Sequence, residues 1–135
     1  MDAVEIMRKT KSFAIIGASA KEDSYGYKLV KNLTDVGYKV YPINPKYPEI
    51  YEIKTYQGLG ELPDTPDNIV FAMSPYNNLK SFENLNIEKT TYIWFPPECW
   101  NDELIAKAKE MNIQVLQDVC PIGTYLKLFN SKKEI

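Results

Sequence analysis

Residues 13–26 read Phe-Ala-Ile-Ile-Gly-Ala-Ser-Ala-Lys-Glu-Asp-Ser-Tyr-Gly, an apolar run that breaks into small residues at Gly17. The apolar part has the composition of a buried strand, and Ser24 is a suitable N-cap for a helix that begins near Tyr25. A strand, a loop of small residues and a helix in this order are typical of a Rossmann-type phosphate site, where backbone N–H groups and a helix N-terminus face an anion. We therefore expect this loop to bind phosphate.

The next predicted strand ends in the turn Asn44-Pro45-Lys46. Chains that bind dinucleotides usually place an acidic residue here, where it accepts a hydrogen bond from a ribose hydroxyl. A carboxylate would repel a phosphate at this point, whereas Lys46 would attract one. Proline fixes φ and presents the lysine from a stiff turn. The turn therefore favours a nucleotide that carries an additional phosphate near its ribose, and it disfavours NAD.

Short apolar segments alternate with helix-forming segments along the whole chain. Strands are expected at 13–16, 39–43, 68–73, 91–95 and 114–116, and helices at 2–9, 25–36, 76–85, 101–111 and 122–129. The connection 47–66 is rich in proline and glycine and should contain a short extended piece near 53–56. The alternation predicts an α/β fold, a Rossmann-type doubly wound parallel sheet of five strands with helices on both faces.

Right-handed crossovers favour the strand order 3-2-1-4-5, which reverses between strands one and four. Ligands bind outside the carboxyl ends of the strands at such a reversal. Four loops are expected to meet there, at 17–26, 44–46, 74–77 and 96–100. The first three supply the candidate nucleotide-binding residues Gly17, Ala18, Ser19, Tyr25, Gly26, Asn44, Pro45, Lys46, Ser74 and Pro75. Gly17 would let the backbone approach a pyrophosphate, and Ser19 offers a hydroxyl. Two roles stay open for the Tyr25 side chain: it covers the phosphates of the ligand, or it only packs at the start of the helix. For Ser74 and Pro75, a ligand contact and a plain strand stop are both open.

The composition is that of a soluble globular protein, with 44% hydrophobic and 25% charged residues among 135, and we expect a single domain over residues 1–135. The net charge of −2 argues against a nucleic acid or a membrane surface as partner. No apolar run reaches membrane-spanning length, and the N-terminal residues lack the pattern of a signal peptide. A cytoplasmic location is therefore expected.

The chain contains no histidine, which removes Ser-His-Asp and Cys-His catalysis and most zinc sites. Its two cysteines, Cys99 and Cys120, are too few for a disulfide framework or a metal site by themselves. Cys120 is expected to be a buried structural thiol at the end of a strand, and not a reactive one. The sequence around Cys99 gives even less reason to expect a reactive thiol. We therefore expect no catalytic residue, no metal ligand and no enzymatic activity.

Four segments resemble the stand-alone CoA-binding proteins, a family similar to the CoA-binding domain of the succinyl-CoA synthetase alpha subunit. They are Ile-Gly-Ala-Ser at 16–19, Ser-Tyr-Gly at 24–26, Gly-Tyr-Lys-Val-Tyr-Pro-Ile-Asn-Pro-Lys-Tyr at 37–47 and Asp-Val-Cys-Pro at 118–121. The sequence departs from the family at 95–100, where Phe-Pro-Pro-Glu-Cys-Trp replaces a small loop containing glycine. The resemblance implies that the ligand is coenzyme A or an acyl-CoA, and that the protein is a non-catalytic carrier, sensor or regulatory module.

Two other functions stay open at this point. Lys46 would hold a 2′-phosphate as well as a 3′-phosphate, so an NADP-binding redox protein or sensor fits the same residues. The second alternative is a protein-interaction subunit that binds no ligand. The sequence leaves open the acyl group, the oligomeric state and any protein partner.

Overall fold

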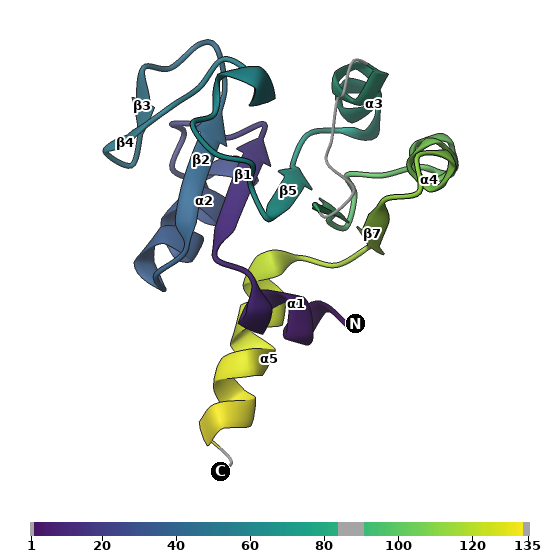
Figure 1. Cartoon of the computed structure of the whole chain (residues 1–135). Helices are drawn as coiled ribbons and strands as arrows, with labels where there is room; N and C mark the ends of the chain where they lie inside the picture. Colours follow the sequence, from purple (N-terminus) through teal and green to yellow (C-terminus); the bar gives the residue numbers. More distant parts are fainter. Residues whose placement is uncertain (1, 84–90, 134–135) are drawn as a thin grey trace.

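The computed structural model describes residues 2–83 and 91–133, which form a parallel five-stranded sheet with helices packed on it (Figure 1). The strands of the sheet are β1 (Ser12–Ile16), β2 (Lys39–Ile43), β5 (Asn68–Phe71), β6 (Tyr92–Phe95) and β7 (Gln114–Gln117). The connection between β2 and β5 contains a small antiparallel pair, β3 (Glu49–Ile50) and β4 (Ile53–Lys54), and the 3-10 helix η1 (Leu59–Glu61). The α/β class and the parallel sheet of five strands are confirmed.

The helices are α1 (Ala3–Lys9), α2 (Tyr25–Asp35), α3 (Pro75–Glu83), α4 (Asp102–Glu110) and α5 (Pro121–Lys133). Ser24 caps α2 by accepting a hydrogen bond from the Tyr27 N–H, and Asn101 caps α4 in the same way. The predicted end of α3 at Leu85 lies outside the described residues. No helix in the described part of the chain is long and apolar enough to cross a membrane.

Two apolar layers hold the helices to the sheet. Phe13 and Ile15 of β1 pack on the face covered by α1, α2 and α5, whereas Ala14 and Ile16 pack on the face covered by α3 and α4 (Figure 1). The alternation follows from the strand geometry, since successive side chains point to opposite faces. Because both faces are covered, β1 is buried along nearly its whole length.

The strand order differs from the prediction. It is β2-β1-β5-β6-β7, or 2-1-3-4-5 when the five strands are numbered along the chain. The predicted order 3-2-1-4-5 is wrong because β5 pairs with β1 and not with β2. The place beside β2 is taken by a single bridge between Ile43 and Tyr56, where the Tyr56 N–H donates to the carbonyl of Pro42 over 2.9 Å. In a Rossmann sheet of order 3-2-1-4-5 the third strand lies beside the second. Here the extended piece expected near 53–56 takes that place, but only Tyr56 pairs with β2.

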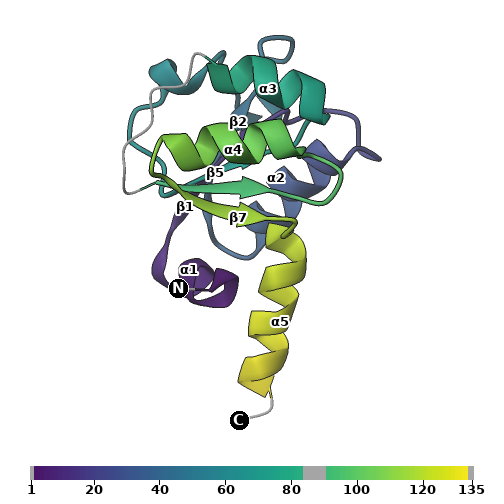
Figure 2. The same ribbon diagram turned by 90° about the vertical axis from the view of Figure 1, so that its right-hand side faces the viewer.

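The reversal of the sheet consequently lies between β1 and β5. These strands are neighbours up to their ends, where the Ala72 N–H donates to the Ile16 carbonyl over 2.9 Å. Figure 2 shows the loops that follow β1, β6 and β7 gathered on its right-hand side, opposite the loops that enter the strands. The carboxyl ends of parallel strands at a reversal are the usual position of a ligand in this class of fold.

Candidate functional site

Gly17 stands where β1 turns into the loop, between the ends of β2 and β5. Its φ of +94° lies in the left-handed region, which glycine adopts without strain. Its N–H donates to the Ile43 carbonyl of β2 over 3.4 Å. A Cβ at this position would lie 2.4 Å from Cγ of Met73, which follows β5. The bare backbone of Gly17 thus lets the loop pass close to the end of β5.

Gly26, in the first turn of α2, packs on the backbone of the same loop. A Cβ here would lie 2.3 Å from the Gly17 carbonyl oxygen and 3.1 Å from the Cα of Ala18, which is fully buried. Neither contact involves a flexible side chain, so the helix approaches the loop as closely as backbone atoms allow. Two of the predicted site residues, Gly17 and Gly26, therefore lock the loop to the start of α2.

The phosphate loop, residues 17–24, keeps several backbone donors free. The N–H groups of Ala18, Ser19 and Ala20 donate to no acceptor within residues 2–83 and 91–133. The Ser19 hydroxyl accepts from the Lys21 N–H over 3.1 Å, which tightens the loop. Helix α2 follows with no acidic residue in its first turn. Free N–H groups in a loop that leads into an 11-residue helix suit an anion, through hydrogen bonds from the loop and through the helix dipole.

Asn44 joins the turn after β2 to the phosphate loop. Its Nδ2 donates to the Ala18 carbonyl over 2.8 Å, and its Oδ1 accepts from the Lys46 N–H over 2.9 Å. Its own N–H donates to the Tyr56 carbonyl over 3.0 Å. The side chain of Asn44 therefore holds the turn in place beside the phosphate loop. Pro45 and Lys46 are exposed, so the lysine side chain extends from a turn that is fixed to the phosphate loop.

A pocket of about 430 Å³ adjoins the phosphate loop at the ends of β5, β6 and β7. It is lined by Tyr25, Ala72, Met73, Ser74, Pro97, Glu98, Cys99 and Cys120. Met73 also faces Gly17, so the pocket adjoins the first residue of the phosphate loop. The sequence analysis placed Tyr25 and Ser74 among the site residues and expected the loop 96–100 at this end of the sheet, but it named none of the other six as a site residue. Their common signal is position, because each follows a strand of the sheet at its carboxyl end.

Tyr25 spans this pocket. Its hydroxyl donates a hydrogen bond to Sγ of Cys120 over 2.9 Å. Burial raises the pKa of the Tyr25 hydroxyl well above its ordinary value, and the bond to Cys120 adds to the increase. The phenol therefore stays protonated and remains a donor at any physiological pH. Tyr25 links α2 to the start of α5 and forms a wall of the pocket.

The two cysteines differ in exposure. The prediction that Cys120 is a buried thiol is wrong, because Cys120 is half-buried and lines the pocket. It directly precedes α5, so its carbonyl, and not its side chain, is engaged by the helix, accepting from the Thr124 N–H over 3.0 Å. Cys99 is buried, and burial raises the pKa of its thiol to about 11, with smaller contributions from Cys120 and Glu98.

The loops that carry the cysteines are tied to each other and to α3. Asn78, fully buried in α3, donates from Nδ2 to the carbonyls of Met73 over 2.8 Å and Cys99 over 2.7 Å. The Trp100 indole N–H donates to Oδ1 of Asp118 over 3.2 Å. The loops after β5, β6 and β7 are thereby held in one arrangement. Asn78 was not predicted, because an asparagine inside a helix carries no signal in sequence.

The segment Ser74-Pro75 begins α3. Pro75 is the first helical residue, a position where its missing N–H costs nothing, and the Ser74 carbonyl accepts from the Asn78 N–H over 2.9 Å. Ser74 lines the pocket, whereas Pro75 does not. Its place as the first residue of α3 is sufficient to explain Pro75. Of the two residues, only Ser74 lies in the pocket where a ligand would touch it.

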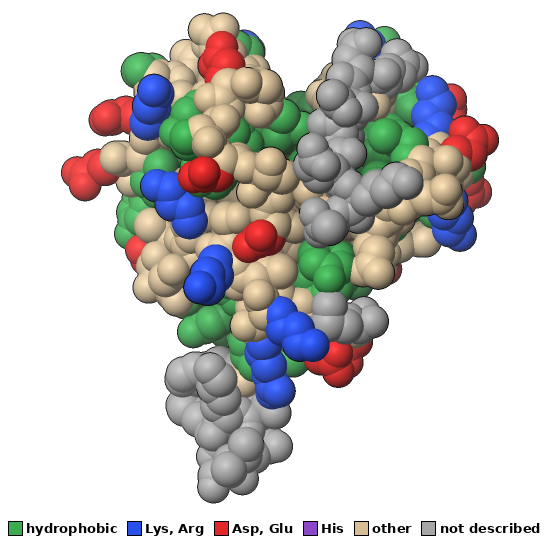
Figure 3. Space-filling model, viewed as in Figure 1, with side chains coloured by type: hydrophobic (Ala, Val, Ile, Leu, Met, Phe, Trp, Pro, Cys, Tyr) green, Lys and Arg blue, Asp and Glu red, His purple; other side chains and the backbone are tan. Residues whose placement is uncertain are grey.

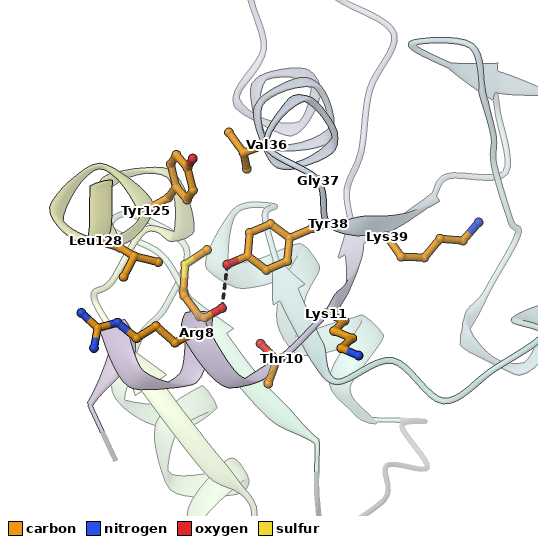
Figure 4. A pocket seen from close by; sticks show the side chains of 10 residues that line it. Arg8, Thr10, Lys11, Val36, Gly37, Tyr38, Lys39, Tyr125 and Leu128 are labelled. Carbon is orange, nitrogen blue, oxygen red and sulfur yellow. Dashed lines mark hydrogen bonds between the residues drawn. The ribbon is translucent and has the colours of Figure 1, made fainter. Parts of the chain in front are cut away.

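A second pocket, of about 450 Å³, lies at the opposite end of β1 and β2 (Figure 4). It is lined by Met7, Arg8, Thr10, Lys11, Val36, Gly37, Tyr38, Lys39, Tyr125 and Leu128. The Tyr38 hydroxyl donates to the Met7 carbonyl across it over 2.6 Å (Figure 4). On the face seen in Figure 3, Lys and Arg side chains are spread over both the upper and the lower half. None of the ten predicted site residues lines this pocket, and amino ends of strands are not where this class of fold binds nucleotides.

Residues 11–125 match the family described as the CoA binding domain. The match covers most of the chain, so the protein belongs to the CoA-binding domain family, as the resemblance implied. The uncharacterized protein YneT of Bacillus subtilis is 27% identical over 117 residues, 86% of each chain. The hypothetical protein from Pyrococcus horikoshii OT3 has a similar structure, with a TM-score of 0.82 and 27% identity over 93% of this chain and 88% of that one.

Longer proteins match over part of the chain. The ADP-forming acetate–CoA ligase of Methanocaldococcus jannaschii is 49% identical over 63 residues, which is 47% of this chain and 9% of the ligase. Subunit alpha of the ADP-forming acetate–CoA ligase I of Pyrococcus furiosus is 40% identical over 77 residues, 53% of this chain and 17% of that subunit. The chain thus spans a small part of the length of these ligases. It is related to their CoA-binding domain.

Proposed function

We propose that the protein binds coenzyme A or an acyl-CoA at the carboxyl ends of β1, β2 and β5, and that it acts as a carrier, sensor or regulatory module without catalysing a reaction by itself. The observation that carries this proposal is the contact between Gly26 and the Gly17 carbonyl. It holds the start of α2 against a loop with three free backbone N–H groups, in a chain that belongs to a CoA-binding family.

The parts of CoA are assigned to the site by charge. The pyrophosphate is placed at the N–H groups of Ala18 and Ser19, where the helix dipole and the hydrogen bonds favour an anion. The 3′-phosphate is placed at Lys46, on the turn that Asn44 fixes beside this loop. The pantetheine arm is left to run past Met73 into the pocket beside Tyr25. NADP is the second candidate, because Lys46 suits its 2′-phosphate equally well.

CoA is expected to raise the melting temperature of the protein, because a ligand that binds only the folded state stabilises it by mass action. At a concentration one hundred times the Kd the gain is about 2.7 kcal/mol, which is about 10 °C for a domain of this size. Thermal melts with CoA, acetyl-CoA, NADP and NAD at the same millimolar concentration make the comparison. If NADP raises the melting temperature and CoA leaves it unchanged, the CoA assignment is wrong.

Replacing Lys46 with alanine should weaken CoA binding about tenfold or more, because one charge-assisted hydrogen bond contributes about 1.5–3 kcal/mol. The loss should be much smaller for dephospho-CoA, which lacks the 3′-phosphate. Isothermal titration of both ligands measures the two effects. Lys9→Ala, which removes the same charge from α1, is the matched control and should leave both affinities unchanged. An equal loss for CoA and dephospho-CoA would move Lys46 to the pyrophosphate.

A further inference from the structure

The pocket beside Tyr25 contains both thiols of the protein. Cys99 follows β6 and Cys120 follows β7, two strands that pair from Tyr92 to Phe95. The other residues that line the pocket include the apolar Ala72, Met73 and Pro97, together with Ser74 and Glu98. Two thiols in the lining of one pocket are unusual for purely structural cysteines, because buried structural thiols are normally surrounded by packed side chains.

The two thiols are not equivalent. Cys120 is half-exposed to the pocket, and its sulfur accepts a hydrogen bond from the Tyr25 hydroxyl over 2.9 Å. A thiol that is open to the pocket can reach a ligand bound there, and access is one requirement for thiol–disulfide exchange. Cys99 is buried, and at pH 7 a thiol with a pKa of about 11 is ionised in about one molecule in ten thousand. Cys120 is therefore the attacking thiol of the pair.

The backbone of the two thiol loops is also unusual. Glu98, directly before Cys99, has a φ of +70°, and Asp118, two residues before Cys120, has a φ of +63°. Left-handed conformations cost a residue other than glycine about 1–2 kcal/mol, and they persist where surrounding contacts over-determine them. The bonds of Asn78 and Trp100 supply those contacts here. Each cysteine thus lies within two residues of a left-handed residue, in a loop that is held by a side-chain hydrogen bond.

We infer that this two-thiol pocket receives the sulfur end of CoA and that Cys120 exchanges with a CoA disulfide to form a mixed disulfide between the protein and CoA. The inference rests on the proposed function, since the phosphate loop must hold the nucleotide half while the pantetheine arm reaches the pocket. The pocket would then react with CoA disulfide, the oxidised form of the ligand. Covalent capture of CoA would therefore depend on how much of the CoA pool is oxidised.

The exchange is balanced without any further oxidant. Cys120 gives its proton to water, and its thiolate attacks one sulfur of the CoA disulfide. The sulfur–sulfur bond of the ligand breaks as a bond forms between Cys120 and one CoA, and the second CoA leaves as a thiolate that takes up a proton. Release is the same reaction in reverse, with a free thiol as the attacking group. Because Cys99 is almost wholly protonated at neutral pH, it does not displace CoA from Cys120, and the mixed disulfide persists.

The test uses the full-length reduced protein and CoA disulfide at pH 7.5 without oxygen, followed by intact-mass measurement under non-reducing conditions. The expected product is one adduct with the mass of CoA less two hydrogens, located at Cys120 by peptide mapping and removed by dithiothreitol. It should form at least about tenfold faster than the adduct with glutathione disulfide at equal concentration, because the nucleotide half holds the reacting sulfur in place. Tyr25→Phe should slow the exchange several-fold.

Cys99→Ser and Cys120→Ser form the matched pair of variants. Cys99→Ser should keep the adduct, and Cys120→Ser should lose it while circular dichroism shows that the variant is folded. An adduct at Cys99, a dominant internal disulfide, or equal rates with CoA disulfide and glutathione disulfide would each overturn the inference. A wild-type protein that binds reduced CoA and forms no adduct overturns the inference alone. A protein that binds no CoA in calorimetry overturns the proposed function as well.

Discussion

Replacing Gly26 with alanine is expected to lower the free energy of unfolding by about 3 kcal/mol, the upper part of the range for an added methyl group in a packed region. The new Cβ would lie 2.3 Å from the Gly17 carbonyl oxygen, and backbone cannot rotate out of the way as a side chain can. For a domain of this size the melting temperature should fall by about 10 °C. Because the loop must shift to make room, CoA affinity should fall with it.

Gly123→Ala in α5 is the matched control for this variant. Gly123 is also helical, and a Cβ added there meets no atom within 4 Å. Alanine at such a position should raise stability by as much as about 1 kcal/mol, because glycine loses more conformational entropy on folding. Glycine-to-alanine substitution is thus expected to lower the stability of the protein in α2 and to raise it in α5. A Gly26→Ala protein that melts at the wild-type temperature would contradict the close packing of α2 on the loop.

Gly17→Val should remove CoA binding while the sheet remains folded. Valine is strained in the left-handed region that Gly17 occupies, and its Cβ would press on Met73 in the wall of the pocket. The N–H groups of Ala18 and Ser19 would then turn away from the pyrophosphate. Losing two charge-assisted hydrogen bonds corresponds to at least about a hundredfold in affinity. Isothermal titration measures the loss, and circular dichroism confirms that the variant is folded.

Gly37→Val separates the effect on the site from the effect on the backbone. Gly37 has a φ of +105°, and a Cβ there meets nothing within 4 Å. It lies at the end of α2, far from the phosphate loop in sequence, and lines the pocket at the opposite end of the sheet. Both variants should lose about 1–2 kcal/mol of stability from the forced φ, but only Gly17→Val should lose CoA. Equal binding by the two variants would remove the phosphate-loop argument.

The strands, the helices and the loop after β1 could be predicted because each depends on residues that are close together in the sequence. The small residues after Ile16, the cap at Ser24 and the cap at Asn101 each depend on a few neighbours in sequence, and the structure has each of them. The bonds that Asn44 forms with Ala18 and Lys46 are also between segments that the prediction had placed at one edge. Whether these residues hold CoA stays a prediction.

The strand order could not be predicted, because it depends on how a long connection packs. Residues 44–67 form one bridge to β2, at Tyr56, and then cross to the far side of β1. A third strand of one residue has no periodicity, so the next apolar run, Asn68–Phe71, was counted in its place. The handedness rule permits both orders and does not choose between them.

The pocket was missed for a different reason. Its walls come from three loops that are far apart in sequence, and Cys99 and Cys120 were considered separately, as two single cysteines. The order β1-β5-β6-β7 brings the loops together, and Asn78 fixes them there. Burial of Cys99 and exposure of Cys120 are likewise properties of that arrangement, since both follow apolar strands of similar composition.

The single bridge at Tyr56 also protects the protein from aggregation. Outer strands with free N–H and C=O groups are templates for pairing with other chains. Along β2 the outward groups around Pro42 are already occupied, since Tyr56 donates to the Pro42 carbonyl and accepts from the Asn44 N–H, and proline has no N–H to offer. A second copy of the chain would have to break these bonds before it could add a strand here. The other outer strand of the described sheet, β7, pairs with β6 and has no bridge of this kind among the described residues.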